Sequence, residues 1–161
     1  MGKFARFHKR SEAESIRSGA TEMDVRLAKQ EDLAEIAEIA AIREGEQLEK
    51  WQLSINRTFK SSAADRALLV VASSQGRIVG YGKAGSFVPP DAAPSNVAPE
   101  GWYLTGLIVR PAFRRQGIGS SLTMARLAWI AKRANRVFYL ANVRNKVSIA
   151  LHSRFGFVEQ T

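Results

Sequence analysis

Cysteine is absent from the sequence, and histidine is nearly so. The missing cysteines exclude disulfide bonds, cysteine-ligated metal ions and a thiol nucleophile. Because His8 and His152 are the only histidines, a histidine-rich metal site is not expected either, and we predict no bound metal. No apolar run reaches the roughly 18 residues needed to cross a membrane, and the first residues lack the apolar stretch of a secretory signal. These absences predict a soluble cytoplasmic protein with no membrane partner.

Acidic side chains are almost missing from the last part of the chain. Residues 101–161 contain ten lysines and arginines but a single acid, Glu159, so they carry the whole net charge of +9. This excess predicts a polyanionic partner. A phosphate-bearing small molecule and a nucleic acid fit the charge equally well. So does a solvated helix face formed by Arg126, Lys132 and Arg133.

Length and composition predict one compact domain. The chain has 161 residues, of which 45% are hydrophobic, enough for a single sizeable core. Residues 1–22 show no sustained apolar period and are expected to be a tail or a cloning remnant, so the domain is assigned to residues 23–161. Its apolar patterns predict an α/β fold. Strands are expected at residues 23–29, 67–73, 77–87, 103–109 and 137–142, with helices at 30–43, from 48 to about 60, from 118 onward and from 145 to 155.

The most informative stretch is a strand, a basic loop and a helix in direct succession. An apolar run ends at Val109, and Pro111 cannot continue a strand ladder. A loop rich in arginine and glycine follows, and a helix with a regular apolar stripe begins near Ile118. A glycine turn at this place leaves backbone N–H groups unpaired at the positive end of the helix dipole. The stretch therefore predicts a phosphate site.

The loop differs from two common phosphate loops. It has no Gly-Lys-Ser/Thr, and it lacks the third glycine of the dinucleotide fingerprint. A plain turn, in which the glycines only relieve crowding, is the alternative. The loop, read as Arg114-x-x-Gly117-x-Gly119 after Val109-x-Pro111, resembles the Gln/Arg-x-x-Gly-x-Gly/Ala loop of the Gcn5-related N-acetyltransferases.

A second segment resembles the same family. Residues 145–157 match the pattern Asn-x-x-Ala/Ser-x-x-Leu-Tyr/His-x-x-x-Gly-Phe. The residues themselves predict a helix capped by Asn145 and stopped by Gly156. The Ser-Ile-x-Leu-His form is most similar to the branch that acetylates small amines, amino-acid analogues and antibiotics. The two motifs occur in the family's order, and the resemblance covers residues 23–161.

This resemblance implies a fold and a donor. The fold would be a mixed, mostly antiparallel central sheet, flanked by helices and splayed at its central strands. The donor would be acetyl-coenzyme A, whose phosphates also suit the basic half of the chain. Its pyrophosphate would lie on the loop, and its pantetheine arm along the central strand. The expected contacts are Leu107, Ile108, Val109, Arg114, Arg115, Gln116, Gly117, Ile118, Gly119, Ser120 and Asn145.

The resemblance also implies candidates for proton transfer. His152 stands where many relatives have a tyrosine that protonates the departing sulfur, and an imidazole could do the same. The alternative is that His152 only packs beneath the cofactor. Some relatives carry a glutamate early in the central strand, and Glu100 is the candidate general base here. A water-mediated route from backbone carbonyls is its rival.

The predicted function is transfer of acetyl from acetyl-coenzyme A to a primary amine by direct attack, on an amino-acid analogue, a polyamine or an antibiotic. Glu44, Glu46 and Glu49 are possible contacts to a cationic amine, although a solvated helix face would also explain them. The alternatives are an acetyltransferase acting on a protein amine and a coenzyme-A- or nucleotide-binding module without transferase activity. A nucleic-acid-binding protein is less expected.

The last residues depart from the family pattern. Relatives continue after the Gly-Phe pair with further strands, whereas this chain stops at Thr161. The final strand is therefore expected to be missing or to come from a partner chain in a homodimer. A sheet edge left open there would invite pairing.

Overall fold

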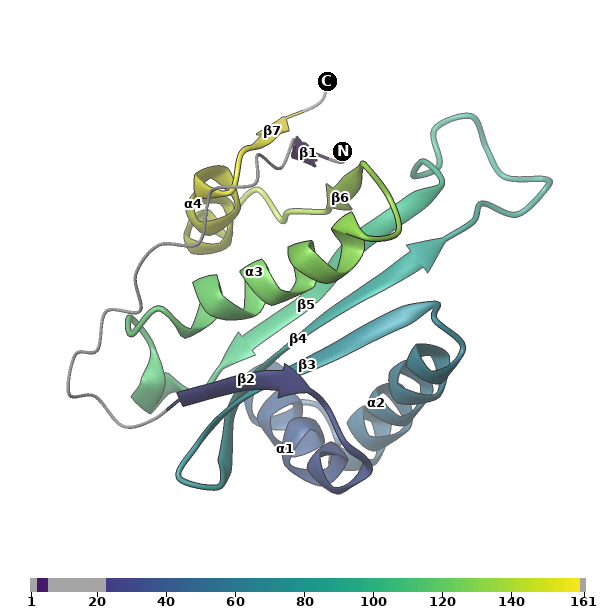
Figure 1. The fold of residues 1–161 in the computed structure, drawn as a ribbon. Helices are drawn as coiled ribbons and strands as arrows, with labels where there is room; N and C mark the ends of the chain where they lie inside the picture. Colours follow the sequence, from purple (N-terminus) through teal and green to yellow (C-terminus); the bar gives the residue numbers. More distant parts are fainter. Residues whose placement is uncertain (1–2, 6–22, 160–161) are drawn as a thin grey trace.

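A computed structural model describes residues 3–5 and 23–159 (Figure 1). The tail predicted for residues 1–22 lies outside this part, except for three residues that form a strand. None of the described helices is long and apolar enough to span a membrane. The elements are the strands β1 (Lys3–Ala5), β2 (Met23–Leu27), β3 (Ala67–Ser74), β4 (Arg77–Phe87), β5 (Gly101–Val109), β6 (Val137–Tyr139) and β7 (Phe157–Glu159), the helices α1 (Leu33–Glu44), α2 (Leu48–Ala63), α3 (Ile118–Ala131) and α4 (Lys146–Arg154), and the 3-10 turns Gln30–Asp32 and Pro111–Phe113.

The main sheet has five strands in the order β2-β3-β4-β5-β6. Neighbouring strands are antiparallel, except that β6 runs parallel to β5. A crossover through α3 connects these two parallel strands, as parallel pairing requires. The predicted α/β class and the mixed, mostly antiparallel sheet are confirmed.

Local sequence signals place several boundaries. The two-residue turn between β3 and β4 has Gln75 and Gly76 at φ values of 50° and 75°, the conformation that a tight hairpin needs. Gly45 ends α1 with φ at 67°, and Gly156 follows α4 with φ at 84°. The predicted cap of α4 is also present, since the Asn145 side chain accepts a hydrogen bond from the Ser148 N–H at 3.1 Å.

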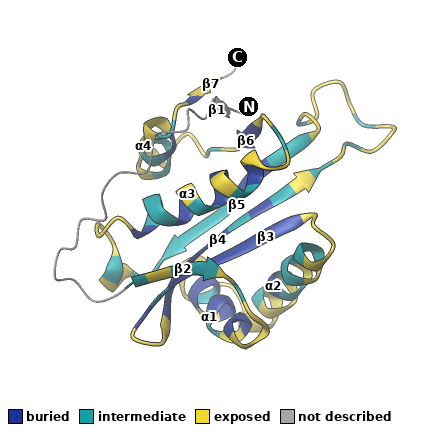
Figure 2. Ribbon diagram, in the orientation of Figure 1, coloured by how far each residue is buried: buried dark blue, intermediate teal, exposed yellow. Residues whose placement is uncertain are grey.

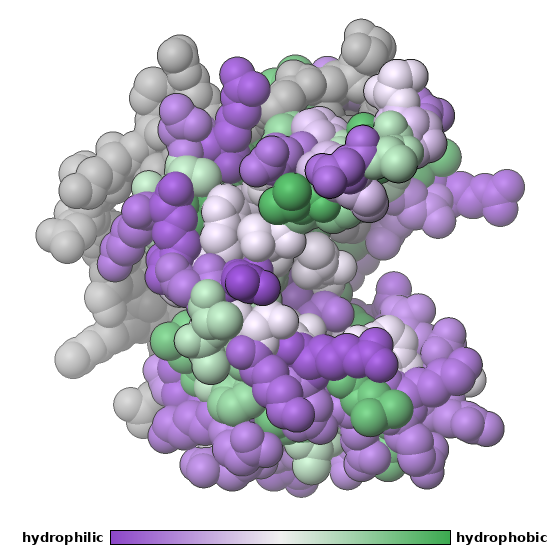
Figure 3. Space-filling model, turned by 90° about the vertical axis from the view of Figure 1, so that its right-hand side faces the viewer, coloured by the Kyte–Doolittle hydropathy of each residue, from purple (hydrophilic) through white to green (hydrophobic). Residues whose placement is uncertain are grey.

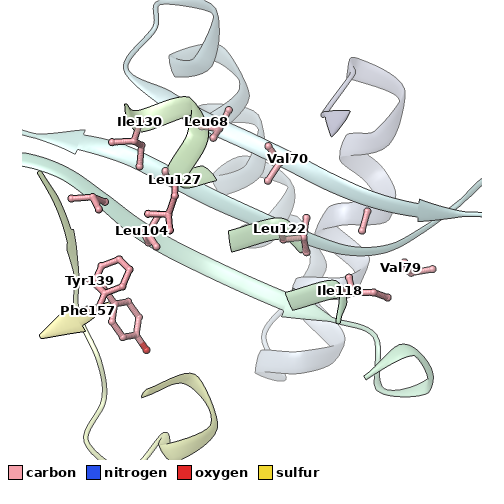
Figure 4. Packing of buried hydrophobic residues seen from close by; sticks show 13 residues of the cluster. Leu68, Val70, Val79, Leu104, Ile118, Leu122, Leu127, Ile130, Tyr139 and Phe157 are labelled. Carbon is pink, nitrogen blue, oxygen red and sulfur yellow. The ribbon is translucent and has the colours of Figure 1, made fainter. Parts of the chain in front are cut away.

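Helices cover both faces of the sheet, and each face has its own apolar core (Figure 2). On one face, α1 and α2 pack on β3 and β4 through a cluster that includes Ile36, Ile55 and Val71. On the other face, α3 packs on β3, β4 and β5 (Figure 4). The labelled members of this second cluster are Leu68, Val70, Val79, Leu104, Ile118, Leu122, Leu127, Ile130, Tyr139 and Phe157.

The central strands separate halfway along β5. Strand β5 pairs with β4 along its whole length, but with β6 only through Trp102, Tyr103 and Leu104. The β4–β5 register shifts at the same place and leaves Thr105 opposite no residue of β4, which is a β-bulge. The predicted splay is confirmed, and β6 ends at Tyr139, shorter than expected, because the chain has already turned away from β5.

The last strand has a partner that the sequence did not indicate. Lys3–Ala5 (β1) pairs antiparallel with Phe157–Glu159 (β7) in a separate two-stranded sheet. The edge expected to be open at the end of the chain is therefore paired on one side with the first strand. Figure 1 shows these two strands side by side above α4.

Candidate active site

An open backbone edge runs along the second half of β5. Residues 106–109 pair with β4 on one side, and β6 no longer pairs with residues 105–109 on the other. Alternate N–H and C=O groups of this segment point toward the space that β6 has left. The predicted cofactor contacts Leu107, Ile108 and Val109 lie on this edge. An extended molecule with amide groups could hydrogen-bond along it as an extra strand.

The arginine-glycine loop joins this edge to the start of α3. Arg115 and Gly117 both have left-handed backbone, with φ values of 60° and 80°, and α3 begins at Ile118. The first N–H of the helix to reach a carbonyl is that of Ser121, which donates to Gly117 at 3.0 Å. The preceding N–H groups are therefore available to an anion, and the turn and the helix dipole both favour negative charge there.

Three elements meet behind the loop. A Cβ added to Gly119 would lie 3.7 Å from Leu151 of α4 and 3.8 Å from Leu107 of β5. The structure thus brings the loop, the open edge and the second predicted motif together. Arg114 adds a further link, because its Nε donates to the Val109 carbonyl at 3.2 Å. Asn145 is exposed and caps α4, and its contact to a cofactor stays a prediction.

His152 is buried, with only 2% of its surface exposed. Its Nδ1–H donates to the Ser148 carbonyl at 2.7 Å, and its ring stacks on Tyr139 with centroids 3.6 Å apart. The hydroxyls of Tyr139 and Ser148 also hydrogen-bond. Burial, with a smaller effect of the nearby Arg126 charge, lowers the pKa of His152 to about 4. The imidazole is therefore neutral at pH 7, which favours the packing role over that of proton donor.

Glu100 lies apart from the other predicted site residues. It is exposed and directly precedes β5, at the end of the strand that is still paired with β6. Thr105 lies five positions further along the chain, about 16 Å away along an extended strand. This position gives no support to Glu100 as general base. The water-mediated route from backbone carbonyls is the alternative that we carry forward.

One explanation offered for the positive charge was a solvated helix face that included Arg126, and for Arg126 this explanation is wrong. The side chain is 1% exposed, and burial lowers its pKa to about 10. Its Nη1 donates to the carbonyls of Lys83 and Gly106, both at 3.1 Å. One signal could have revealed this, because Arg126 lies four residues from both Leu122 and Ile130 in the apolar stripe of α3.

The face opposite α3 carries a pocket of about 330 Å³. It lies between α2 and the sheet, and it reaches Thr105 at the bulge. Figure 3 views the molecule from the side where α2 ends and β3 begins, and the surface is hollowed there between two lobes. Glu44, Glu46 and Glu49 were possible contacts to a cationic amine, with a solvated helix face as the alternative, and they are exposed and do not line the pocket. The lining residues are Arg57, Thr58, Ser61, Arg66, Ala67, Ala84, Gly85, Ser86 and Thr105.

Comparison with known proteins identifies the family. The model of the acetyltransferase (GNAT) family matches residues 31–157, so the chain belongs to this family. This confirms the family and the acyltransferase class predicted from the two motifs. A search among curated proteins found no match.

Solved structures with the same fold include aminoglycoside acetyltransferases. The enzyme AAC(6')-Iy, in complex with a bisubstrate analogue of coenzyme A and acetylneamine, has a TM-score of 0.70 at 20% identity, with 88% of this chain and 94% of that chain covered. The apo aminoglycoside 6'-N-acetyltransferase AAC(6')-Ig from Acinetobacter haemolyticus has a TM-score of 0.69 at 19% identity, with 86% and 92% covered. An acetyltransferase of Trypanosoma brucei has a TM-score of 0.65 at 18% identity, with 87% and 95% covered.

Proposed function

We propose that this protein transfers an acetyl group from acetyl-coenzyme A to the primary amine of a small molecule by direct attack. The observation that carries the proposal is the position of Thr105. This residue begins the open edge of β5, and it also lines the pocket on the opposite face. A donor held along the edge and an acceptor held in the pocket would therefore meet at the bulge.

On the donor side, the residues fit an extended molecule that ends in phosphates. The N–H groups after Gly117 would hold the pyrophosphate, and the exposed side chains of Arg114 and Arg115 would supply charge. The open edge at residues 105–109 would hold the pantetheine amides as an added strand. When bound, the thioester supplies an activated acyl carbon. Backbone N–H groups at the bulge would polarise its carbonyl and so stabilise the developing oxyanion.

On the acceptor side, the amine must be neutral when it attacks. No cysteine is present anywhere in the chain, so an acyl-cysteine intermediate is excluded and attack on the thioester carbon would be direct. The nitrogen would form the new bond to this carbon, and the carbon–sulfur bond would break with its electron pair going to sulfur, so that coenzyme A leaves as a thiolate. The amine proton would leave through water held by backbone carbonyls at the bulge, and water would protonate the thiolate. The neutral ring of His152 is not a source of protons. Its role would instead be to hold α4 in position by packing.

Free-thiol release tests the proposal directly. Acetyl-coenzyme A, a panel of small amines and the protein should together release thiol in proportion to the acceptor, as transfer requires. Calorimetry with coenzyme A should show binding without an acceptor. Thiol release that never depends on an acceptor, together with measurable coenzyme A binding, would leave the protein as a binding module.

A substitution in the pocket tests whether the pocket binds the acceptor and not the donor. Ser61 lines the pocket from α2, and Ser61→Phe should lower transfer at least about tenfold while leaving coenzyme A affinity unchanged. Ala63 is exposed at the end of the same helix and does not line the pocket, so Ala63→Phe is the matched control. Equal loss of transfer in both variants would contradict the assignment of the pocket to the acceptor.

A further inference from the structure

The acceptor pocket is lined by cationic and hydroxyl side chains. Arg57 of α2 and Arg66, just before β3, are both among its lining residues, and neither Asp nor Glu is. Thr105 lies at the end of the pocket that meets the open edge. The hydroxyl-bearing lining residues are Thr58, Ser61, Ser86 and Thr105. Such a surface is suited to an anion that also accepts hydrogen bonds.

The two arginines have no ion-pair partner among the residues that the structure describes. Both are exposed. Asp65, the acid next to Arg66 in sequence, forms an ion pair with Arg133 instead, with 2.7 Å between Arg133 Nη2 and Asp65 Oδ1. The positive charge of Arg57 and Arg66 is therefore available to a ligand.

We propose that the acceptor is an amine that also carries a carboxylate or phosphate group, which Arg57 and Arg66 bind while the amine reaches Thr105. The proposal rests on the acetyl transfer proposed above. A guanidinium group matches the oxygen geometry of both anions, and it is always charged. A polycationic aminoglycoside would instead meet two like charges and no carboxylate in this pocket.

The size of the pocket agrees with such an acceptor. A volume of about 330 Å³ is near the lower end of ligand pockets, which span roughly 300–1,000 Å³. It suits a molecule of the size of an amino acid or an amino-alcohol phosphate better than an oligosaccharide. The acceptor branch predicted from the second motif is thus narrowed to amino-acid-like and phosphate-bearing amines.

Matched pairs of acceptors test the proposal. L-alanine with L-alaninamide, and phosphoethanolamine with ethanolamine, differ within each pair by the anionic group. The panel also includes neamine as a polycation. Two measurements are made: acceptor binding to the free protein by NMR titration, and thiol release with acetyl-coenzyme A. The anionic member of at least one pair should bind about tenfold more tightly or better, and comparison of the pairs separates carboxylate from phosphate.

The arginine variants identify the source of the preference. Arg57→Gln and Arg66→Gln should each weaken binding of the anionic amine, and the double variant should bind both members of the pair equally. Lys60→Gln is the matched control, because Lys60 is an exposed cation of α2 that does not line the pocket. Both arginines are exposed, so we expect the variants to fold, as circular dichroism would verify.

The outcomes separate this proposal from the function on which it rests. Preferential transfer to neamine, or to the member of each pair that lacks the anionic group, would overturn the anionic acceptor and leave the proposed acetyl transfer intact. Binding of an anionic amine that depends on the arginines, without thiol release from acetyl-coenzyme A in the presence of any acceptor, would support an anionic ligand in the pocket. The same result would overturn the proposed acetyl transfer. An unchanged preference in the double variant would also overturn the proposal.

Discussion

The guanidinium group of Arg126 donates a hydrogen bond to the carbonyl of Gly106, 3.1 Å away. Gly106 directly follows the bulged Thr105, and the same nitrogen donates to Lys83 on the neighbouring strand. A side chain of α3 therefore ties β4 and β5 together at the register shift. Gly82 makes room for it, because a Cβ there would lie 3.0 Å from two atoms of Arg126.

Replacing this arginine should destabilise the fold. In Arg126→Met, the carbonyls of Lys83 and Gly106 lose a buried donor, so we expect the free energy of unfolding to fall by about 2–4 kcal/mol. Urea denaturation measures the change. Lys132→Met, an exposed cation just beyond the same helix, should change stability by less than about 0.5 kcal/mol. Similar stabilities for the two variants would contradict the role of Arg126 as a tie between strands.

The two glycines of the loop should respond differently to substitution. Gly117 has a left-handed φ of 80°, so Gly117→Val strains the backbone and should weaken coenzyme A binding at least about tenfold. Gly119 is helical, and an added Cβ would make only ordinary contacts, so Gly119→Ala should fold normally. Calorimetry with coenzyme A gives the affinities. Full binding by folded Gly117→Val would argue against the phosphate cradle.

The buried histidine should make stability depend on pH. Its pKa is lowered from 6.5 to about 4, so the unfolded chain binds more protons than the folded protein between these values. The stabilising contribution of the neutral ring is fully present above pH 6.5 and is lost as the pH falls toward 4, on the order of 2–3 kcal/mol.

His152→Phe isolates this effect, since it keeps a ring on Tyr139 and removes the titrating group. The free energies of unfolding of the native protein and the variant should therefore converge or cross as the pH falls from 6.5 to 4. His8 is present in both proteins and cancels from the comparison. Parallel stability curves would mean that His152 titrates normally, and its role as proton donor would then regain support.

The basic half of the chain predicts how the donor's phosphates contribute to binding. Coenzyme A and acetyl-coenzyme A should bind within about tenfold of each other, whereas dephospho-coenzyme A should bind more weakly. Added salt should narrow that gap, because it screens the exposed side chains of Arg114 and Arg115. Arg114→Ala with Arg115→Asn should narrow it as well, and asparagine tolerates the left-handed backbone at position 115. If dephospho-coenzyme A bound as tightly as coenzyme A, and added salt changed neither affinity, the basic half of the chain would be expected to bind another partner.

Local patterns predicted the five strands of the main sheet, the four helices and the cap of α4. The cap at Asn145 and the stop at Gly156 depend on residues within one turn of helix, so their neighbours in sequence determine them. The loop before α3 is equally local. The splay of the sheet was predicted only from the resemblance to the family motifs, because neither periodicity nor composition indicates it.

The features that sequence reasoning missed depend on distant pairs of residues. Arg126 is buried because its hydrogen bonds reach Lys83 and because Gly82 has no side chain, more than 40 positions away. Strand β1 pairs with β7 across nearly the whole chain. The pocket combines Arg57 with Thr105, and no spacing rule relates residues so far apart.

The position of Thr105 also bears on the kinetics. The donor would lie under α3 and α4, and the acceptor pocket lies under α2 on the other face of the sheet, so the two substrates would reach the bulge from opposite sides. A bound donor would not block the entry of the acceptor, and a bound acceptor would not block the entry of the donor. The two substrates could therefore bind in either order. Initial rates measured with both substrates varied should give intersecting reciprocal plots, and coenzyme A should compete with acetyl-coenzyme A but not with the amine.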